Sequence, residues 1–414
     1  MPNNCDTLII GAGAAGLMAA IQCAQRGQSV TLLEKMDRPG RKLLITGKGR
    51  CNVTNCCTIE EFMPNVLSNP RFLYSCLNAL NPYEVMGFFE ECGVPLKVER
   101  GERVFPVSDR SADIVQALVD KARQLGCQLV HGCADALLIG EGRVEGMSLT
   151  DGQKLYAHSV IVATGGKSYP ATGSTGDGYR LAKQAGHRVT PLRPSLIPLV
   201  CKEKYCRDMM GLSLKNVTLK VTDRSSGKVV FEELGEMLFT HFGVSGPLVL
   251  SASCHMKPDK TGSLEGYRLS IDLKPGLSHS QLDARILRDF EQFINKDFIN
   301  SLGQLLPRKA IQPVAILSGI PFETKINQIT REQRIRLVEV IKELPVTPLS
   351  FRPIEEAIVT AGGVDVSQVN PKTMESKLLP GLYFAGEVLD VDGYTGGFNL
   401  QIAFSTAFAA GNHC

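Results

Sequence analysis

The fold of this chain is decided by Thr7-Leu-Ile-Ile-Gly-Ala-Gly-Ala-Ala-Gly16. A short apolar run leads into glycines spaced G-x-G-x-x-G, and residues 17–25 then carry apolar side chains at helical spacing. The glycines permit a tight turn and let main-chain N–H groups at a helix N-terminus meet a pyrophosphate. A β-rich run at 29–33 completes a βαβ unit. The sequence therefore predicts a Rossmann-type dinucleotide-binding domain in an α/β protein.

An acidic residue supports this interpretation. Glu34 stands at the end of the second predicted strand, 18 residues after Gly16. A carboxylate there accepts hydrogen bonds from ribose hydroxyls and disfavours a 2′-phosphate. The glycine spacing alone is weak, but strand, glycines, helix, strand and acid in register make a chance match improbable. FAD and NAD share this pattern, so the choice between them must come from elsewhere.

Two later segments favour FAD over NAD. Val160-Ile-Val-Ala-Thr-Gly-Gly166 is an apolar strand that runs into a glycine turn, and Leu382-Tyr-Phe-Ala-Gly-Glu387 is a strand that ends in an acid suited to ribityl hydroxyls. Both segments recur in flavoproteins of the glutathione reductase type, which this chain resembles over its N- and C-terminal parts. Taken alone, residues 163–166 could equally form an ordinary turn at a strand end.

Length, charge and cysteine content limit the organisation and the partners. A chain of 414 residues is too long for one hydrophobic core, so we expect two or three domains. The net charge of +3, from 45 basic and 42 acidic residues, identifies neither a nucleic acid nor a membrane as partner. The 13 cysteines include no C-x-x-C pair, which predicts reduced thiols and no metal site.

Targeting features do not stand out in the sequence. Residues 1–6 lack the basic region of a secretory signal. No apolar stretch approaches the roughly 18 residues that a membrane span needs. We therefore expect a cytoplasmic protein with no membrane partner.

The pattern of the chain changes twice between its ends. Alternating runs at 214–221 and 228–232 predict antiparallel strands, and from about 278 to 343 the spacing is helical. The expected domains are a nucleotide-binding domain at 1–190 plus 352–414, an inserted β-rich domain at 191–276 plus 343–351, and a helical domain at 277–342.

Two details of the helical region are also predicted. Thr330, with Gln333 three residues later, forms a capping box for a helix at 331–342. The first helix of the region is expected to carry one apolar face, made of Leu282, Ile286, Leu287, Phe290, Phe293 and Ile294.

A distinctive series of motifs narrows the resemblance. The series comprises Arg41-Lys42, Thr46-Gly-Lys-Gly-Arg-Cys-Asn52, Arg103-Val-Phe-Pro106, Phe239-Thr-His-Phe-Gly-Val-Ser-Gly-Pro247 and residues 393–401. Over essentially its whole length the chain resembles the bacterial BaiN/RdsA-like family of FAD-dependent oxidoreductases. The resemblance implies a Rossmann-type, glutathione reductase-like FAD-binding domain with an inserted β-barrel-like domain and a nested helical domain.

The motifs indicate where FAD would lie. The glycine loop, with the N–H groups of Ala14 and Ala15, would face the pyrophosphate, and a helix N-terminus at 397–401 would face the flavin N1–C2=O edge, where it stabilises the anionic reduced flavin. The resemblance adds Ala134 beside the adenine. The predicted FAD contacts are Gly11, Gly13, Ala14, Ala15, Gly16, Glu34, Lys35, Arg41, Lys42, Thr46, Gly47, Arg50, Asn52, Ala134, Thr164, Gly165, Gly166, Gly386, Glu387, Gly397, Phe398, Asn399, Leu400 and Gln401.

The densest basic segment of the chain overlaps this predicted site. Arg38, Arg41, Lys42, Lys48 and Arg50 place five positive charges in 13 residues, with no acid after Asp37. We favour compensation of the FAD phosphates and a solvated loop. Contact with an RNA backbone is the alternative.

Two side chains are catalytic hypotheses. Cys51 stands between Arg50 and Asn52 in the loop expected near the flavin, where a thiol could donate a proton to carbon opposite the hydride. His241 precedes a glycine turn in the inserted domain and could polarise a carbonyl. For Cys51 the alternative is a small buried residue in a tight loop, and for His241 it is a histidine that satisfies a backbone group.

The expected reaction is a hydride transfer in two stages. A reduced nicotinamide reduces the flavin, and the flavin then reduces an unsaturated acceptor. No second G-x-G-x-x-G is present, so the nicotinamide would bind transiently or be replaced by another small-molecule donor.

The resemblance suggests the acceptor. Members of the family are linked to dihydrouridine formation in large-subunit (23S) ribosomal RNA and to reductive steps on steroid-like compounds. The acceptor that we rank first is uridine in ribosomal RNA or its precursor. The C5=C6 bond of uracil is conjugated to a carbonyl, and the RNA can present the base flipped out of its stack. A small unsaturated or keto compound comes second. An FAD-containing RNA-binding or assembly protein without turnover is the third interpretation.

Overall fold

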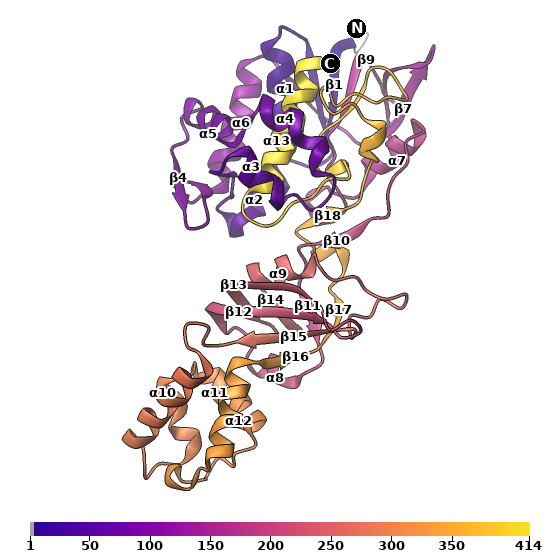
Figure 1. Ribbon diagram of the computed structural model, residues 1–414. Helices are drawn as coiled ribbons and strands as arrows, with labels where there is room; N and C mark the ends of the chain where they lie inside the picture. Colours follow the sequence, from indigo (N-terminus) through magenta and orange to yellow (C-terminus); the bar gives the residue numbers. More distant parts are fainter. Residues whose placement is uncertain (1–3) are drawn as a thin grey trace. The chain divides into compact units, whose positions relative to one another are not determined.

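The computed structural model describes residues 4–414, which form two compact units (Figure 1). The first unit is Met1–Ser195 with Ile354–Cys414, and the second is Leu196–Pro353. Both ends of the chain therefore build the first unit, and the second is inserted between them. The finer division into three domains at the boundaries given above remains a prediction.

The first unit is built on a mainly parallel sheet. In sheet order its parallel strands are β6 (Gln128–His131), β2 (Val30–Glu34), β1 (Asn4–Ile10), β9 (Lys154–Val162) and β19 (Leu382–Phe384). These strands carry apolar side chains on both faces, as expected of a sheet that is covered on both sides. Leu8, Ile9 and Val160 are all fully buried. The βαβ prediction from the glycine motif is confirmed.

Strand β9 pairs with β1 along one edge and has a different partner along each half of its other edge. Its first half pairs antiparallel with β8 (Arg143–Leu149), which pairs in turn with β7 (Ala134–Gly140). Its last residues pair in parallel with β19. Because β1, β9 and β19 run parallel side by side, the loops that follow them leave the sheet at the same edge. That edge is where open α/β sheets bind ligands.

Two helices from opposite ends of the sequence pack along each other in this unit, α1 (Ala14–Gln25) and α13 (Phe398–His413) (Figure 1). A Cβ at Gly411 would lie 2.7 Å from Cβ of Gln22 and 2.8 Å from the main-chain oxygen of Ala19. The close packing therefore requires glycine at position 411. Helix α13 has buried residues on all sides, as expected of a helix inside a core.

The remaining elements of the first unit cover and extend this core. Its helices are α2 (Arg41–Ile45), α3 (Ile59–Phe62), α4 (Tyr74–Ala79), α5 (Pro82–Glu91), α6 (Ser111–Gln124) and α7 (Asp177–Gln184). Its short strands are β3 (Thr54–Asn55), β4 (Leu96–Glu99), β5 (Arg103–Pro106), β10 (Arg193–Ser195) and β18 (Val359–Ala361).

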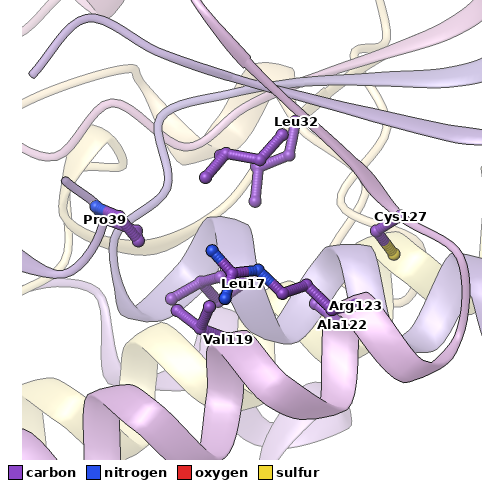
Figure 2. A pocket seen from close by; sticks show the side chains of 8 residues that line it. Leu17, Leu32, Pro39, Val119, Ala122, Arg123 and Cys127 are labelled. Carbon is purple, nitrogen blue, oxygen red and sulfur yellow. The ribbon is translucent and has the colours of Figure 1, made fainter. Parts of the chain in front are cut away.

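A small pocket lies between α1, α6 and the neighbouring strands (Figure 2). Apart from the Cys127 thiol, Arg123 supplies its only polar side chain. The lining residues are Leu17, Leu32, Pro39, Val119, Ala122, Arg123, Cys127 and Leu129. Ligand sites usually combine an apolar wall with several converging polar groups. We therefore interpret this pocket as a gap in helix packing.

The second unit contains an antiparallel sheet. Its strand order is β16 (Leu344–Val346), β15 (Tyr267–Asp272), β12 (Ser213–Asp223), β13 (Val229–Phe239), β14 (Gly243–Ser245), β11 (Leu199–Cys201) and β17 (Pro348–Phe351). The long pair β12 and β13 contains the two alternating runs that predicted antiparallel strands, and this prediction is confirmed. Two short helices, α8 (Lys204–Asp208) and α9 (Pro247–Ser253), complete this region.

Three longer helices follow within the second unit: α10 (His279–Gln292), α11 (Arg308–Ser318) and α12 (Arg331–Lys342). The predicted capping box is confirmed, because Thr330 Oγ1 accepts from Gln333 N at 3.2 Å and Gln333 Oε1 accepts from Thr330 N at 2.9 Å. Side chains of α10 and of the sheet belong to one apolar core.

The apolar face predicted for α10 was too wide. Leu282, Ile286 and Phe290 are buried, as expected of positions three and four residues apart. Leu287 is 39% exposed and Ile294 is 51% exposed. Leu287 lies about 100° around the helix from Ile286, and Ile294 follows the end of the helix.

Among residues 4–414, no helix is long and apolar enough to cross a membrane.

Candidate functional site

The glycine loop after β1 is shaped by close backbone contacts. Gly11 has φ +100°, and a Cβ there would lie 2.7 Å from the main-chain oxygen of Ala163. A Cβ at Gly16 would lie 1.8 Å from the main-chain oxygen of Gly11. At Gly13, by contrast, a Cβ would meet no atom within 4 Å. The loop is therefore tight against the protein at Gly11 and Gly16 and open at Gly13.

Helix α1 begins at this open point. Gly13 is its N-cap, and no acidic side chain lies in its first turn. The first N–H groups of a helix have no intrahelical acceptors and carry partial positive charge. Ala14 and Ala15 thus present main-chain donors beside open space, which fits a pyrophosphate.

Glu34 lies next to the loop, at the end of β2. Its Oε2 accepts from Ala12 N and its Oε1 accepts from Met36 N, both at 2.8 Å. Each carboxylate oxygen has a further lone pair, so the side chain can still accept from a ribose hydroxyl. The adjacent Lys35 is engaged elsewhere.

The Lys35 ammonium binds Asp177 Oδ2 and Thr175 Oγ1, each at 2.5 Å, at the start of α7. Burial acts to raise the pKa of Asp177, but the hydrogen bonds from Lys35 and Thr175 outweigh it and lower this pKa. The sequence placed Lys35 beside the ribose. The structure shows in addition that it ties α7 to the end of β2.

Two predicted FAD contacts have buried polar atoms without a partner. Among the described residues, Thr164 Oγ1 and Asn52 Oδ1 have no hydrogen-bond partner. A buried polar atom without a partner is costly, and a cofactor with polar groups at these two atoms would satisfy them. Both atoms belong to segments that the sequence placed beside the cofactor.

Glu387 is the centre of a polar network that joins four distant segments. Lys42 Nζ donates to Glu387 Oε2 and to Ser168 Oγ, both at 2.7 Å. Thr360 N donates to Glu387 Oε1 at 2.9 Å, and Ser168 Oγ donates to the same oxygen at 3.1 Å. Thr360 Oγ1 in turn accepts from Ser168 N at 3.1 Å.

Half of this network could not be found from the sequence. Lys42 and Glu387 were predicted as separate FAD contacts, and the structure brings them together. Ser168 and Thr360 were not predicted, because isolated Ser and Thr residues follow no recognisable spacing. Only Gly165 and Gly166, which precede Ser168 at the end of β9, marked this turn.

The segment that carries Glu387 reaches the start of α1. Gly386 has φ +77°, and a Cβ there would lie 2.9 Å from Cβ of Ala15. The Gly386 N–H donates to Thr406 Oγ1 on α13 at 2.9 Å. The predicted pyrophosphate and ribityl residues are therefore neighbours within the first unit.

The N-terminus of α13 is fixed by its own side chains. Asn399 Nδ2 donates to the main-chain oxygens of Gly393 and Tyr394, at 2.7 and 3.2 Å. Gln401 is fully buried, accepts from Thr54 Oγ1 and donates to the main chain of Leu80. These two side chains hold the loop in place.

The main-chain N–H groups in the first turn of α13 are the donors that a ligand could use. Gly397, the N-cap, has φ +101°, and a Cβ there would lie 2.2 Å from the main-chain oxygen of Thr54. Phe398, Asn399 and Leu400 follow in the first turn and have no intrahelical acceptor for their N–H groups.

The loop 46–52 adopts a left-handed path. Gly47, Lys48 and Cys51 have φ of 55°, 59° and 59°. The Thr46 hydroxyl donates to the main-chain oxygen of Leu43 at 2.7 Å. Arg50 anchors the loop, because its guanidinium stacks 4.1 Å from the ring centroid of Phe105 and pairs with the carboxylates of Glu99 and Asp109.

The predicted proton donor Cys51 is fully enclosed by this loop and the core. Its exposed fraction is 0%, and burial raises the pKa of its thiol to about 12. The thiol therefore stays protonated at neutral pH, and a substrate in solvent does not reach it in this arrangement. These observations fit the packing interpretation of Cys51 better than the catalytic one.

Ion pairs within the first unit compensate most of the basic segment. They join Arg41 to Asp37 at 2.8 Å, Lys42 to Glu387 at 2.7 Å and Arg50 to Asp109 at 2.6 Å. Arg38 and Lys48 are exposed. Because three of the five charges are paired inside the unit, the segment fits a cofactor loop better than an RNA footprint.

The last two predicted residues lie in different places. Ala134 is buried at the start of β7, where its main-chain oxygen accepts from Arg180 at 3.1 Å. His241 is exposed in the second unit, between β13 and β14, with its ring edge-to-face on Phe242 at 5.0 Å between centroids. Among the described residues there is no group of three or more His, Cys, Asp or Glu that could hold a metal ion.

A parallel sheet whose strand ends gather a glycine loop, a ribose-side carboxylate and an open helix N-terminus defines a Rossmann-type dinucleotide-binding protein. The chain matches the family described as "HI0933-like protein Rossmann domain" over residues 5–413, and it belongs to that family.

Three relatives match almost the full length. The chain is 34% identical to the "Ribosomal RNA dihydrouridine synthase" of Haemophilus influenzae, over 98% of this chain and 97% of the relative. It is 31% identical to the protein of the same name in Escherichia coli K12, over 98% and 96%. It is 32% identical to the "3-dehydro-bile acid delta(4,6)-reductase" of Clostridium scindens, over 97% of both. The chain is thus an FAD-dependent oxidoreductase.

Solved structures show the same fold at low identity. A 3-ketosteroid delta1-dehydrogenase from Sterolibacterium denitrificans matches 99% of both chains, with 13% identity and a TM-score of 0.51. A quinol-fumarate reductase matches 100% of this chain and 70% of its own, with 16% identity and a TM-score of 0.50.

Proposed function

We propose that this protein reduces uridine to dihydrouridine in large-subunit (23S) ribosomal RNA. The observation that carries the proposal is the full-length match to two proteins named ribosomal RNA dihydrouridine synthase, at 31% and 34% identity. When bound, FAD would supply hydride chemistry for the C5=C6 bond of uracil, with a proton completing the reduction and a small reductant, such as a reduced nicotinamide, as the electron source. Because the substrate is ribosomal RNA, the proposed place of action is the cytoplasm.

The proposed FAD contacts follow from the geometry of the first unit. The N–H groups of Ala14 and Ala15, open beside Gly13, hold the pyrophosphate. Glu34 accepts from the adenosine ribose. Glu387, held by Lys42, accepts from the ribityl chain. The first turn of α13 places partial positive charge beside the flavin.

The other predicted contacts remain part of the proposal. They are Gly11, Gly16, Lys35, Arg41, Thr46, Gly47, Arg50, Asn52, Ala134, Thr164, Gly165, Gly166, Gly386, Gly397, Phe398, Asn399, Leu400 and Gln401.

His241 is the better supported of the two catalytic hypotheses, because it is exposed whereas Cys51 is enclosed. An imidazole can polarise a carbonyl by donating a hydrogen bond. Changing His241 to Ala should lower the reduction rate and leave FAD bound. An unchanged rate would remove it from the reaction.

The charge of the second unit supports an RNA substrate. Residues 196–353 contain 22 Lys and Arg against 17 Asp and Glu, whereas the rest of the chain contains 23 against 25. Phosphate contacts supply most of the affinity in RNA binding. We therefore propose that the second unit makes the larger share of the RNA contacts.

The experiment is mass spectrometry of nucleosides from purified large-subunit ribosomal RNA, with and without this gene. Dihydrouridine should disappear in the deletion and return with the wild-type gene. It should not return with Glu34→Arg, which places a positive charge at the ribose site, and it should return with the matched reversal Glu90→Arg on the exposed end of α5. Unchanged dihydrouridine in the deletion would contradict the proposal.

A second candidate is the reduction of a small unsaturated or keto compound. The specific observation for it is the 32% identity to a bile acid reductase over 97% of both chains. Reoxidation of the reduced flavoprotein by a conjugated enone, with no change in ribosomal dihydrouridine, would favour this candidate. A protein that binds FAD and RNA but cannot be reduced by any donor would instead act without turnover.

A further inference from the structure

Two cysteines meet where helices α1 and α13 of the first unit end. Cys23 lies in the last turn of α1, and Cys414 follows the last residue of α13. Their sulfur atoms are 3.2 Å apart, although 391 positions separate them in the sequence. Cys23 is fully buried, and Cys414 is partly exposed.

Several neighbours hold Cys414 in this position. Its main-chain oxygen accepts from Gln28 Nε2 at 2.7 Å and from Arg26 Nη1 at 3.0 Å. Its sulfur also lies 3.6 Å from Thr7 Oγ1 and 3.6 Å from Gln28 Oε1. Arg26 and Gln28 therefore fix the backbone of Cys414, and its thiol lies against Cys23.

The contact between the two thiols shifts their pKa values in opposite directions. The hydrogen bond with Cys23 lowers the pKa of Cys414, helped by Thr7 and by the positive charge of Arg26, and burial opposes them. The same hydrogen bond and burial raise the pKa of Cys23. A thiolate is the form that reacts with oxidants, and Cys414 is the partly exposed residue of the pair.

We infer that Cys23 and Cys414 are a redox modification site at which a reversible disulfide joins α1 to α13. With hydrogen peroxide as oxidant, the Cys414 thiolate attacks one oxygen and becomes a sulfenic acid, and hydroxide leaves. The Cys23 sulfur then attacks the Cys414 sulfur, and the sulfenic oxygen leaves as water. In total, two thiols and one peroxide give one disulfide and two waters.

The movement that this bond needs is small. A disulfide has a sulfur separation of about 2.05 Å, so the sulfurs must approach by roughly 1.2 Å from their present contact. Cys414 lies beyond the last helical residue, where the backbone can adjust. The second step takes place inside the protein, so burial of Cys23 does not prevent it.

The bond would act on the cofactor region through the helices. α1 starts at the glycine loop and α13 starts at the turn proposed to face the flavin. Tying their far ends together restricts the separation of the two helices. FAD release should therefore be slower in the oxidised protein. This consequence depends on FAD binding and is independent of the electron acceptor.

The test uses the purified FAD-loaded protein, treated with hydrogen peroxide, alkylated and digested for mass spectrometry. We expect a peptide pair joined through Cys23 and Cys414 with the loss of two hydrogen atoms, reversed by dithiothreitol. The thermal midpoint should rise and FAD release should slow in the same samples. Cys414→Ser should abolish all three effects, whereas the matched variant Cys133→Ser, at a partly exposed cysteine of the same unit, should retain them.

Two results would overturn the inference. One is the absence of the joined peptide under conditions in which other cysteines of the protein are oxidised. The other is Cys414 trapped as a sulfenic or sulfinic acid while Cys23 stays a free thiol.

Discussion

The two units of this protein differ in the strand direction of their sheets and in their charge balance. The first has parallel strands whose ends gather the polar groups of the cofactor site, and its charge is nearly balanced, with 23 basic and 25 acidic residues. The second has antiparallel strands and a helical layer, with 22 basic and 17 acidic residues. Parallel strands direct many loops to one edge, which suits a large cofactor. The antiparallel sheet belongs to the other unit, so its surface residues can be changed without altering the strand ends that form the cofactor site.

From this contrast we expect the largest effect from a substitution in the glycine loop, which should lower both the stability of the first unit and its FAD binding. Gly16→Ala places a Cβ 1.8 Å from the Gly11 oxygen, and we expect a loss of more than about 3 kcal/mol in unfolding free energy. Visible flavin absorbance should disappear from the purified protein. The matched variant Gly13→Ala has open space for its Cβ, so it should fold normally and bind FAD more weakly. Wild-type FAD binding and thermal midpoint in Gly16→Ala would contradict this account of the loop.

A substitution in the polar network around Glu387 should have the second largest effect, on FAD affinity. Glu387→Gln removes the charge that Lys42 pairs with at 2.7 Å, and we expect FAD affinity to fall about 10-fold to 100-fold, or about 1.4 to 2.8 kcal/mol. Titration of the apoprotein with FAD measures this. The control Glu355→Gln changes an exposed carboxylate of the same unit. Equal affinity in the two variants would show that Glu387 has only a structural role.

A change in the second unit should leave the cofactor untouched. Thr330→Ala removes the cap of α12 and should cost about 1 kcal/mol of unfolding free energy, whereas Thr330→Ser keeps the hydroxyl and should cost less. FAD affinity should match the wild type in both variants. A drop in FAD affinity for Thr330→Ala would show that the two units are coupled and would contradict their independence.

The smallest effect depends on pH. The pKa of Asp177 is lowered in the folded protein through its pairing with Lys35 and Thr175. Its contribution is therefore present above the ordinary Asp pKa of about 4 and is lost as pH falls through the lowered value. For a partly exposed pair we expect about 0.5 to 1 kcal/mol. The stability difference between wild type and Asp177→Asn should shrink on acidification, and a difference that grew would reverse the sign.

The sequence by itself determined the parts of this protein that depend on neighbours along the chain. The glycine loop, α1 and Glu34 follow each other within 28 residues, so their spacing predicted the βαβ unit and a dinucleotide. The Thr330 cap was predicted for the same reason, because its partner is three residues away. The choice of FAD also came from the sequence, through the strand ends at 160–166 and 382–387.

Tertiary structure decided which distant side chains meet. Lys42, Ser168 and Thr360 converge on the Glu387 carboxylate, and no pattern in the sequence joins these residues. Burial of Cys51 depends on how its loop packs, and the contact of Cys23 with Cys414 depends on two helices from opposite ends of the chain. Backbone geometry limits local spacing to a few patterns, whereas a contact across hundreds of residues exists only once the sheet has brought its strands together.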